Sequence, residues 1–157
     1  MPTLKDFAVQ ALKSGGKVNI LVLCTGNSAR SQMAEYLLRK HGGAFIAAYS
    51  AGTEPKGVNP LTIEVMREAG LDLTLARSKD LKEYLGTLNV HGLIVVCGDA
   101  DKKCPAVWPG VIERLYWPFE DPASAEGARE QKLAKFQQVR DQIDAKVRDW
   151  VAELRRA

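Results

Sequence analysis

The sequence predicts an α/β protein, a three-layer sandwich in which a central parallel sheet of four strands is flanked by helices. Two observations support this prediction. Short apolar runs of strand length alternate along the chain with helical patterns, and no repeat or low-complexity tract interrupts them. The run at residues 18–23 is apolar on both faces, which is typical of a parallel strand covered from both sides.

The first predicted element is a short amphipathic helix over residues 4–12. Thr3 is its candidate cap, and glycine at position 15 ends it. We expect residues 1–16 to form an N-terminal helical extension ahead of a single domain at 17–157.

Two strand–helix units follow. A strand over 18–23 leads into a helix over 29–41, and a strand over 44–49 leads into a helix over 59–70. The last of these begins with Asn59 as cap and a proline in its first turn, a combination that favours a helix start.

The remaining elements are a short helix over 78–85, a buried strand over 92–96, a last strand over 111–117 and a long helix over 128–156. Apolar residues recur in the long helix at steps of three and four, which predicts one face packed on the sheet. They are Leu133, Phe136, Val139, Ile143, Val147, Trp150 and Leu154.

Composition narrows the class of function. The net charge is only +3 over 157 residues, and basic residues are mixed with acidic ones, so we expect no nucleic-acid surface. No apolar stretch is long enough to span a bilayer, and no export signal stands at the start. We therefore expect a cytoplasmic protein that does not bind membranes, with room for a small anionic substrate.

Three cysteines carry the first chemical signal: Cys24, Cys97 and Cys104. An odd number of cysteines in a chain of this kind argues against a structural disulfide framework, and favours reactive thiols or a metal site. The two histidines, His41 and His91, stand in no ligand spacing, so we expect no metal.

Cys24 ends the first strand, and the loop after it has the composition of an anion cradle. The backbone N–H groups of such a loop face the positive end of the following helix. Gly26 lets the loop bend, Asn27 and Ser28 can brace it by side-chain hydrogen bonds, and Arg30 offers a planar fork to a tetrahedral oxyanion. The predicted cradle consists of Thr25, Gly26, Asn27, Ser28, Ala29 and Arg30.

Within this cradle Cys24 is a candidate nucleophile. A helix N-terminus and a nearby cation favour the thiolate, and the hydroxyl of Ser31 can donate a further hydrogen bond to the sulfur. The alternative is a small, inert cysteine in the core. Cys97 also ends a strand, and because ligands bind beyond the carboxyl ends of parallel strands, we expect the two cysteines to meet there.

The stretch VLCTGNSARSQMAE resembles the phosphate-binding loop of low-molecular-weight tyrosine phosphatases, and it is more similar still to thioredoxin-coupled arsenate reductases. The resemblance continues through YSAGTEPKGVNP (49–60), VVCGDADKKCP (95–105) and WPFEDPA (117–123), in the family's order. It covers nearly everything after residue 17 and implies a low-molecular-weight phosphatase-like fold.

The resemblance implies that Asp121, followed by proline, is the general acid. Its role is to protonate the oxygen that leaves when the thiolate attacks arsenic or phosphorus. Glu120 beside it is the alternative acid.

The resemblance further implies a relay of thiols. Cys24 attacks arsenate, Cys97 attacks Cys24 as arsenite leaves, and Cys104 attacks Cys97 to give a disulfide that thioredoxin reduces. It implies no bound cofactor and makes phosphate and sulfate competing anions. We expect a monomer.

Some members of the family hold potassium beside the loop through residues that match Asn27, Glu35, Ser50 and an aspartate. Lys79 stands at the place of the aspartate, so its ammonium group is expected to replace the ion and stabilise the loop. A shift of one residue would instead offer Asp80.

Two other functions stay open. One is a phosphatase that hydrolyses phosphomonoesters through a phosphocysteine at Cys24, for which Cys97 and Cys104 would be dispensable. The family's phosphatases carry tyrosines after the Asp-Pro pair, whereas this chain has no aromatic residue at 122–124. The other is an oxyanion-binding or redox-responsive regulator without turnover.

Overall fold

The computed structural model describes residues 1–97 and 108–156. The sequence-based prediction of four strands interspersed with helices is confirmed. The elements are α1 (Leu4–Ser14), β1 (Val18–Cys24), α2 (Arg30–Gly42), β2 (Ile46–Gly52), α3 (Pro60–Glu68), β3 (Gly92–Val95), β4 (Glu113–Tyr116) and α4 (Arg129–Arg155), with 3-10 turns η1 (Leu81–Glu83) and η2 (Pro122–Ser124). The predicted helix over 78–85 is thus only the single turn η1.

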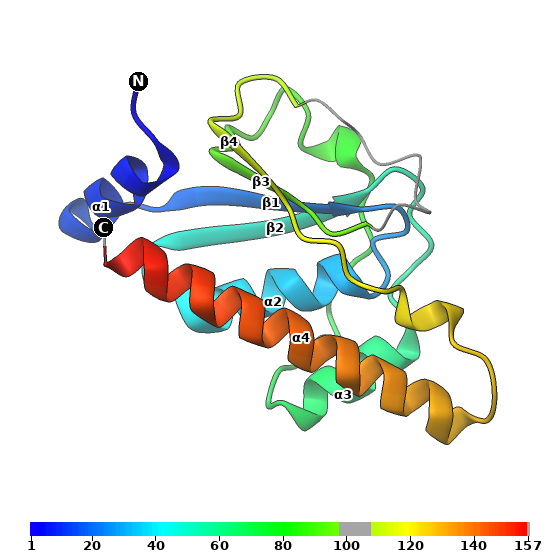
Figure 1. Cartoon of the computed structure of the whole chain (residues 1–157). Coiled ribbons are helices and arrows are strands. Elements are labelled where there is room, and N and C mark those ends of the chain that lie inside the picture. The colour runs from blue at the N-terminus through cyan, green and yellow to red at the C-terminus, as the bar shows by residue number, and fades with distance from the viewer. Residues whose placement is uncertain (98–107, 157) are drawn as a thin grey trace.

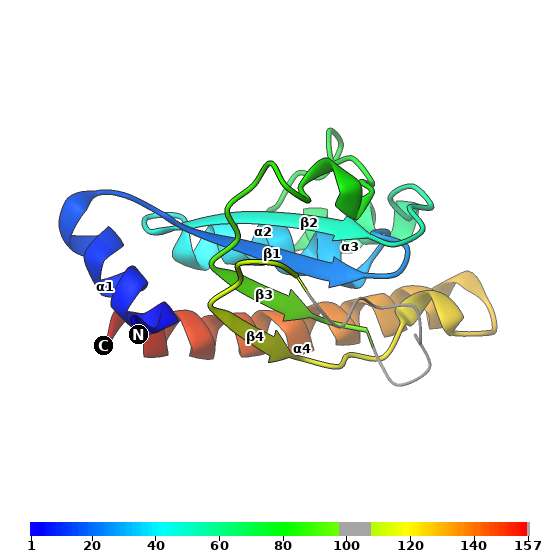
Figure 2. The same cartoon turned by 90° about the horizontal axis from the view of Figure 1, so that it is seen from above.

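The four strands form one parallel sheet in the order β2-β1-β3-β4 (Figure 2). Val22 of β1 pairs with Ser50 of β2 on one side and with Ile94 of β3 on the other. After β1 the chain forms β2 on one side of it, and later it forms β3 on the other side. The carboxyl end of β1, where Cys24 lies, is therefore the switch point at which such sheets bind ligands.

Both faces of the sheet are covered, which gives the three layers. Helices α2, α3 and α4 lie on one face, and the segment around η1 lies on the other (Figure 1). In that segment Leu81, Tyr84 and Leu88 pack against the core. Because β1 lies between the two layers, its residues 20–23 are fully buried, as the apolar run predicts.

Helix α4 spans the length of the molecule. Its 27 residues extend about 40 Å at the usual rise per residue. The buried face contains Val151, whereas the predicted Leu133 and Trp150 are only half-buried. The Trp150 ring meets Trp117 edge-on at 5.4 Å. Among the described helices, none is both long and apolar enough to cross a membrane.

Helix α1 packs at the end of the sheet away from Cys24 (Figure 1). Its start is closed by a reciprocal capping box between Thr3 and Asp6, and its end by Gly15 in the left-handed conformation (φ 79°). The helix buries Leu4, Ala8 and Ala11. It is therefore part of the packed body, remote from the strand ends that carry the cysteines.

His91, just before β3, gives the fold a predicted pH dependence. Burial lowers the pKa of His91, and its Nδ1 accepts the backbone N–H of Asn19 at 2.9 Å, a bond that requires the neutral ring. The unfolded chain takes up this proton near pH ~6.5, whereas the folded chain does so only at lower pH. The unfolded state then binds more protons, so the free energy of unfolding falls as pH decreases below about 6.5.

Urea denaturation at a series of pH values checks this prediction. His91→Gln keeps an acceptor for Asn19 but does not titrate, and its stability is expected to fall less steeply on the acid side than that of the wild type. Identical pH dependence in the two proteins would show that His91 does not contribute.

Candidate active site

The loop after β1 is held with its carbonyl groups outward. Three of its carbonyl oxygens accept backbone N–H groups from residues 54–59: Thr25 from Glu54 at 2.9 Å, Gly26 from Lys56 at 3.0 Å and Ser28 from Asn59 at 3.1 Å. The N–H groups of Gly26, Ser28 and Ala29 have no acceptor within the described chain. With the carbonyls paired outside, the loop offers donors to an anion.

Helix α2 adds its positive end to this loop. Its N-cap is Ala29, which has no side chain able to cap the helix, and its first turn contains no acidic residue. Asn27 adopts a left-handed backbone (φ 46°), a conformation that asparagine tolerates better than most residues. The uncapped helix start is thus left to bind an external negative charge.

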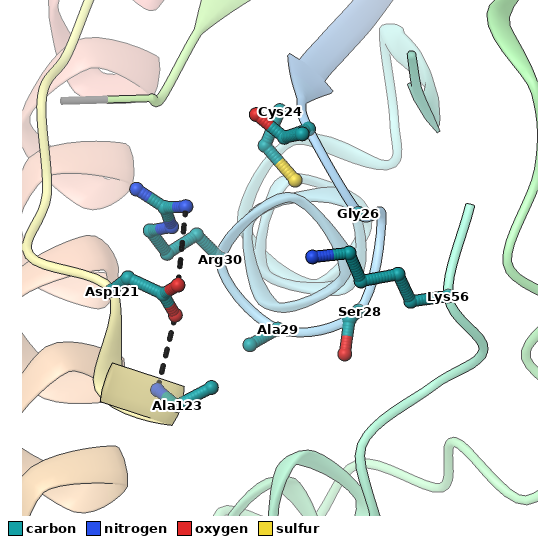
Figure 3. Close-up of a pocket in the computed structure, with 9 residues that line it drawn as sticks. Cys24, Gly26, Ser28, Ala29, Arg30, Lys56, Asp121 and Ala123 are labelled. Carbon is teal, nitrogen blue, oxygen red and sulfur yellow. Dashed lines mark hydrogen bonds and ion pairs between the residues drawn. The ribbon is translucent and has the colours of Figure 1, made fainter. Parts of the chain in front are cut away.

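The loop and its neighbours enclose a small pocket of about 120 Å³, shown in Figure 3. Cys24 is a buried free thiol whose sulfur points into this pocket. None of the described residues that line it is aromatic, so the space suits a compact oxyanion. The lining residues are Cys24, Thr25, Gly26, Ser28, Ala29, Arg30, Lys56, Asp121 and Ala123.

The hydrogen bonds around the sulfur have a fixed direction. Ser50 Oγ lies 2.5 Å from a carboxylate oxygen of Glu35 and donates to it. Asn27 Nδ2 donates to Ser50 Oγ at 2.9 Å and to Ser31 Oγ at 2.8 Å. Because Ser31 accepts from Asn27, its own proton can point at Cys24 Sγ, 2.9 Å away. The N–H of Asn27 adds a second donor to the sulfur at 3.3 Å.

The amide of Asn27 is oriented by two further donors. Its Oδ1 accepts the backbone N–H of Lys79 at 2.8 Å and Nε2 of Gln32 at 2.9 Å. Gln32 is fully buried and also donates to the carbonyl oxygen of Asn27 at 3.2 Å. Sequence analysis missed Gln32. It lies inside the stretch that carries the family resemblance, but nothing in its spacing marks it.

Lys79, not Asp80, lies behind the loop. Its ammonium nitrogen is 3.4 Å from Glu35 Oε1 and 3.5 Å from Ser50 Oγ, and its side chain is 9% exposed. Burial lowers the pKa of Lys79, and the negative charge of Glu35 opposes this shift. Asp80 instead caps η1. The oxygens expected to bind potassium are shared with this ammonium group, so the residues present do not fit an additional cation.

Arg30 and Asp121 meet at the rim of the pocket. Arg30 is 5% exposed and donates to the carbonyl oxygen of Phe119 at 3.1 Å, and its guanidinium lies 3.8 Å from Asp121 Oδ2. Asp121 Oδ1 accepts the N–H of Ala123 at 3.0 Å (Figure 3). Glu120 points elsewhere and pairs with a lysine of α4. Of the two carboxylates considered, only Asp121 lines the pocket.

Cys97 lies beside the end of β1. It is buried, and its sulfur is 3.8 Å from the carbonyl oxygen of Leu23. Cys97 follows Val95, the last residue of β3 and the partner of Leu23, by two positions, and Cys24 follows Leu23 by one. Both cysteines therefore lie at or just past the ends of neighbouring strands. Cys104 lies outside the described residues.

Gly52, at the end of β2, is predicted to be indispensable for the loop. A Cβ atom there would meet the carbonyl oxygen of Thr25 and come within 2.9 Å of the Asn27 nitrogen, both backbone atoms. We expect Gly52→Ala to lower the free energy of unfolding by about 1–3 kcal/mol and to weaken phosphate binding at least tenfold. Urea denaturation and phosphate titration measure both. Gly16→Ala, which meets only a serine hydroxyl at 3.4 Å, is the control, and equal effects in the two variants would refute the prediction.

A parallel sheet whose first strand ends in a cysteine, followed by an anion-binding loop and a helix, defines the low-molecular-weight phosphatase class of fold. Residues 19–157 match the family model described as low molecular weight phosphotyrosine protein phosphatase. The arsenate reductase of Bacillus licheniformis is 46% identical over 132 residues, 84% of this chain and 94% of that protein. That of Bacillus subtilis is 41% identical, with 83% and 93% covered.

A solved structure described as an arsenate reductase in the phosphate binding state gives a TM-score of 0.73 at 29% identity, covering 87% of this chain and 98% of that one. The chain belongs to the low molecular weight phosphotyrosine protein phosphatase family and, within it, to the arsenate reductases.

Proposed function

We propose that this protein reduces arsenate to arsenite with Cys24 as the nucleophile. The proposal is supported above all by the position of the Cys24 sulfur, which faces an anion-sized pocket and lies within reach of two donors, Ser31 Oγ and the Asn27 N–H. The curated relatives with 41–46% identity that are arsenate reductases support the choice of substrate.

In the first step the Cys24 thiolate attacks arsenic while Arg30 and the loop N–H groups hold the arsenate oxygens. One As–O bond breaks, and Asp121 supplies the proton with which that oxygen leaves as water. The product is a covalent adduct in which sulfur is bonded to arsenic. Ser31 and Asn27, which stabilise the thiolate, act before this bond forms.

In the second step the thiolate of Cys97 attacks the sulfur of Cys24. The electron pair of the sulfur–arsenic bond passes to arsenic, arsenite leaves, and a disulfide joins Cys24 to Cys97. Successive side chains in a strand point to opposite faces, and Cys97 lies two positions past Val95 whereas Cys24 lies one position past Leu23, the residue paired with Val95. We therefore propose that the backbone beyond β3 rearranges before the two sulfurs meet.

In the third step Cys104 attacks Cys97, which releases Cys24 and leaves a disulfide between Cys97 and Cys104. An external dithiol then reduces this disulfide, and we propose thioredoxin, acting in the cytoplasm on a protein without a bound cofactor. The proposal rests on the number of cysteines, because each turnover transfers two electrons and a separate resolving thiol suits a protein reductant.

The test is arsenate-dependent NADPH oxidation with thioredoxin and thioredoxin reductase. The wild type is expected to turn over, whereas Cys97→Ser and Cys104→Ser are not. Cys104→Ser is further expected to release about one arsenite per protein and stop, with Cys24 and Cys97 joined. Full turnover in Cys104→Ser would disprove the third step.

Hydrolysis of phosphomonoesters is the second candidate function, because the matching family model describes phosphatases. The wild type would then hydrolyse an aryl phosphate, release no arsenite, and tolerate serine at Cys97 and Cys104. An anion bound in stoichiometric amount without either reaction would instead identify a binding protein.

A further inference from the structure

Lys56 lines the pocket although sequence analysis assigned it no role. It lies between β2 and α3, and its ammonium group points into the pocket from the side opposite to Arg30 (Figure 3). Its backbone N–H donates to the carbonyl oxygen of Gly26 at 3.0 Å. A Cβ atom added at Gly26 would lie 3.4 Å from Lys56 Cδ, so the stem of the lysine crosses the loop where glycine leaves space.

The conformation that directs Lys56 at the pocket is built into its neighbours. Pro55 restricts the backbone before it, and Gly57 adopts a left-handed turn after it (φ 87°). Within the described chain the ammonium group has no ion-pair or hydrogen-bond partner. An exposed cation that faces this pocket, and that has no carboxylate partner among the described residues, is available to an anionic ligand.

The charges of the pocket show why such a cation matters. Apart from Lys56, the charged side chains that line it are Arg30 and Asp121, which lie 3.8 Å apart. Attack by the Cys24 thiolate on a doubly charged oxyanion brings further negative charge to the same space. Arg30 alone leaves this space with excess negative charge, and like charges a few ångströms apart repel strongly.

We propose that Lys56 is a second cationic binding residue, which holds the dianionic form of the inorganic oxyanion against the Cys24 sulfur from the side opposite to Arg30. This inference rests on the pocket of the proposed function, and it adds the charge state of the ligand that the pocket selects.

The test measures how well inorganic phosphate protects Cys24 from alkylation by iodoacetamide. In Lys56→Met the phosphate concentration for half-protection is expected to rise about tenfold, the effect of losing one charge-assisted hydrogen bond. Lys56→Arg keeps the charge and should stay close to the wild type. Lys132→Met, which removes an exposed lysine of α4, controls for net charge, and thermal unfolding controls for folding.

Measurements at pH values on either side of the second ionisation of phosphate separate binding from a structural role. The loss in Lys56→Met is expected to be larger where phosphate is a dianion. Unchanged protection, an equal loss in Lys132→Met, or a loss independent of phosphate charge would each overturn the role of Lys56, whatever the enzyme does with arsenate. If protection depends on Lys56 but the protein does not reduce arsenate, the proposed function is wrong and the role of Lys56 still holds.

Discussion

Cys24→Ser is expected to abolish arsenate reduction, with a fall in rate of more than about 10⁴-fold. A serine hydroxyl needs a base to remove its proton. The two groups that hydrogen-bond the sulfur do not provide one, because Ser31 accepts from Asn27 and directs its own proton at the sulfur, and the Asn27 backbone group is also a donor. A serine also cannot form the disulfide of the second step.

Arsenite formation in a coupled assay measures this loss, and phosphate binding by calorimetry serves as the control. The variant is expected to bind phosphate, because the loop N–H groups and Arg30 are unchanged. Arsenite formation that persists in Cys24→Ser and still depends on thioredoxin would mean that another residue attacks arsenic.

Asp121→Asn is expected to slow the first chemical step by about 10²–10⁴-fold, the usual contribution of a general acid. Asparagine can keep the hydrogen bond to the N–H of Ala123, so the side chain stays at the rim. What it loses is a carboxyl group that can give its proton to the departing oxygen and then, as a carboxylate, pair with Arg30 at 3.8 Å. The measurement is a single-turnover rate of adduct formation at saturating arsenate.

Glu120→Gln is the matched control, since Glu120 precedes Asp121 in the chain but pairs with Lys135 on the surface. Its rate is expected to stay within about twofold of the wild type, because exposed ion pairs contribute little. A larger loss in Glu120→Gln than in Asp121→Asn would exchange the roles of the two carboxylates.

Local patterns predicted most of the fold. The apolar run before Cys24, the Asn59 cap and the glycine at position 15 mark boundaries through interactions between residues close in sequence, and the structure has them at or near the expected places. Helix α4 differs from the prediction in one detail. The apolar pattern placed Trp150 on the buried face, whereas in the structure that face includes Val151 and Trp150 is only partly buried. Which residues of α4 become buried depends on the side chains of the neighbouring elements, and a local sequence pattern does not contain that information.

The candidate site was predictable where one short stretch supplies it. Cys24, Ser31 and Arg30 follow from a strand, a loop and a helix in succession. Gln32 and Gly52 were missed because their importance comes from contacts with distant backbone, the orientation of the Asn27 amide and the close approach of two chain segments.

The choice between Lys79 and Asp80 also required the structure. Gly52 pairs with this segment through a hydrogen bond from its N–H to the carbonyl oxygen of Lys79 at 2.8 Å. This pairing sets which side chain turns toward Glu35. A one-residue shift, which the sequence left open, is thereby decided in favour of the lysine.

Helix α1 and the end of α4 lie together at the end of the sheet away from Cys24 (Figures 1 and 2). Both chain termini therefore lie at the end of the sheet opposite to the pocket. A solid support or a fluorescent protein joined near residue 1 or residue 156 is separated from the pocket by the length of the sheet. Attachment there leaves the mouth of the pocket facing the solution, so that the proposed binding of oxyanions can be measured on the attached protein.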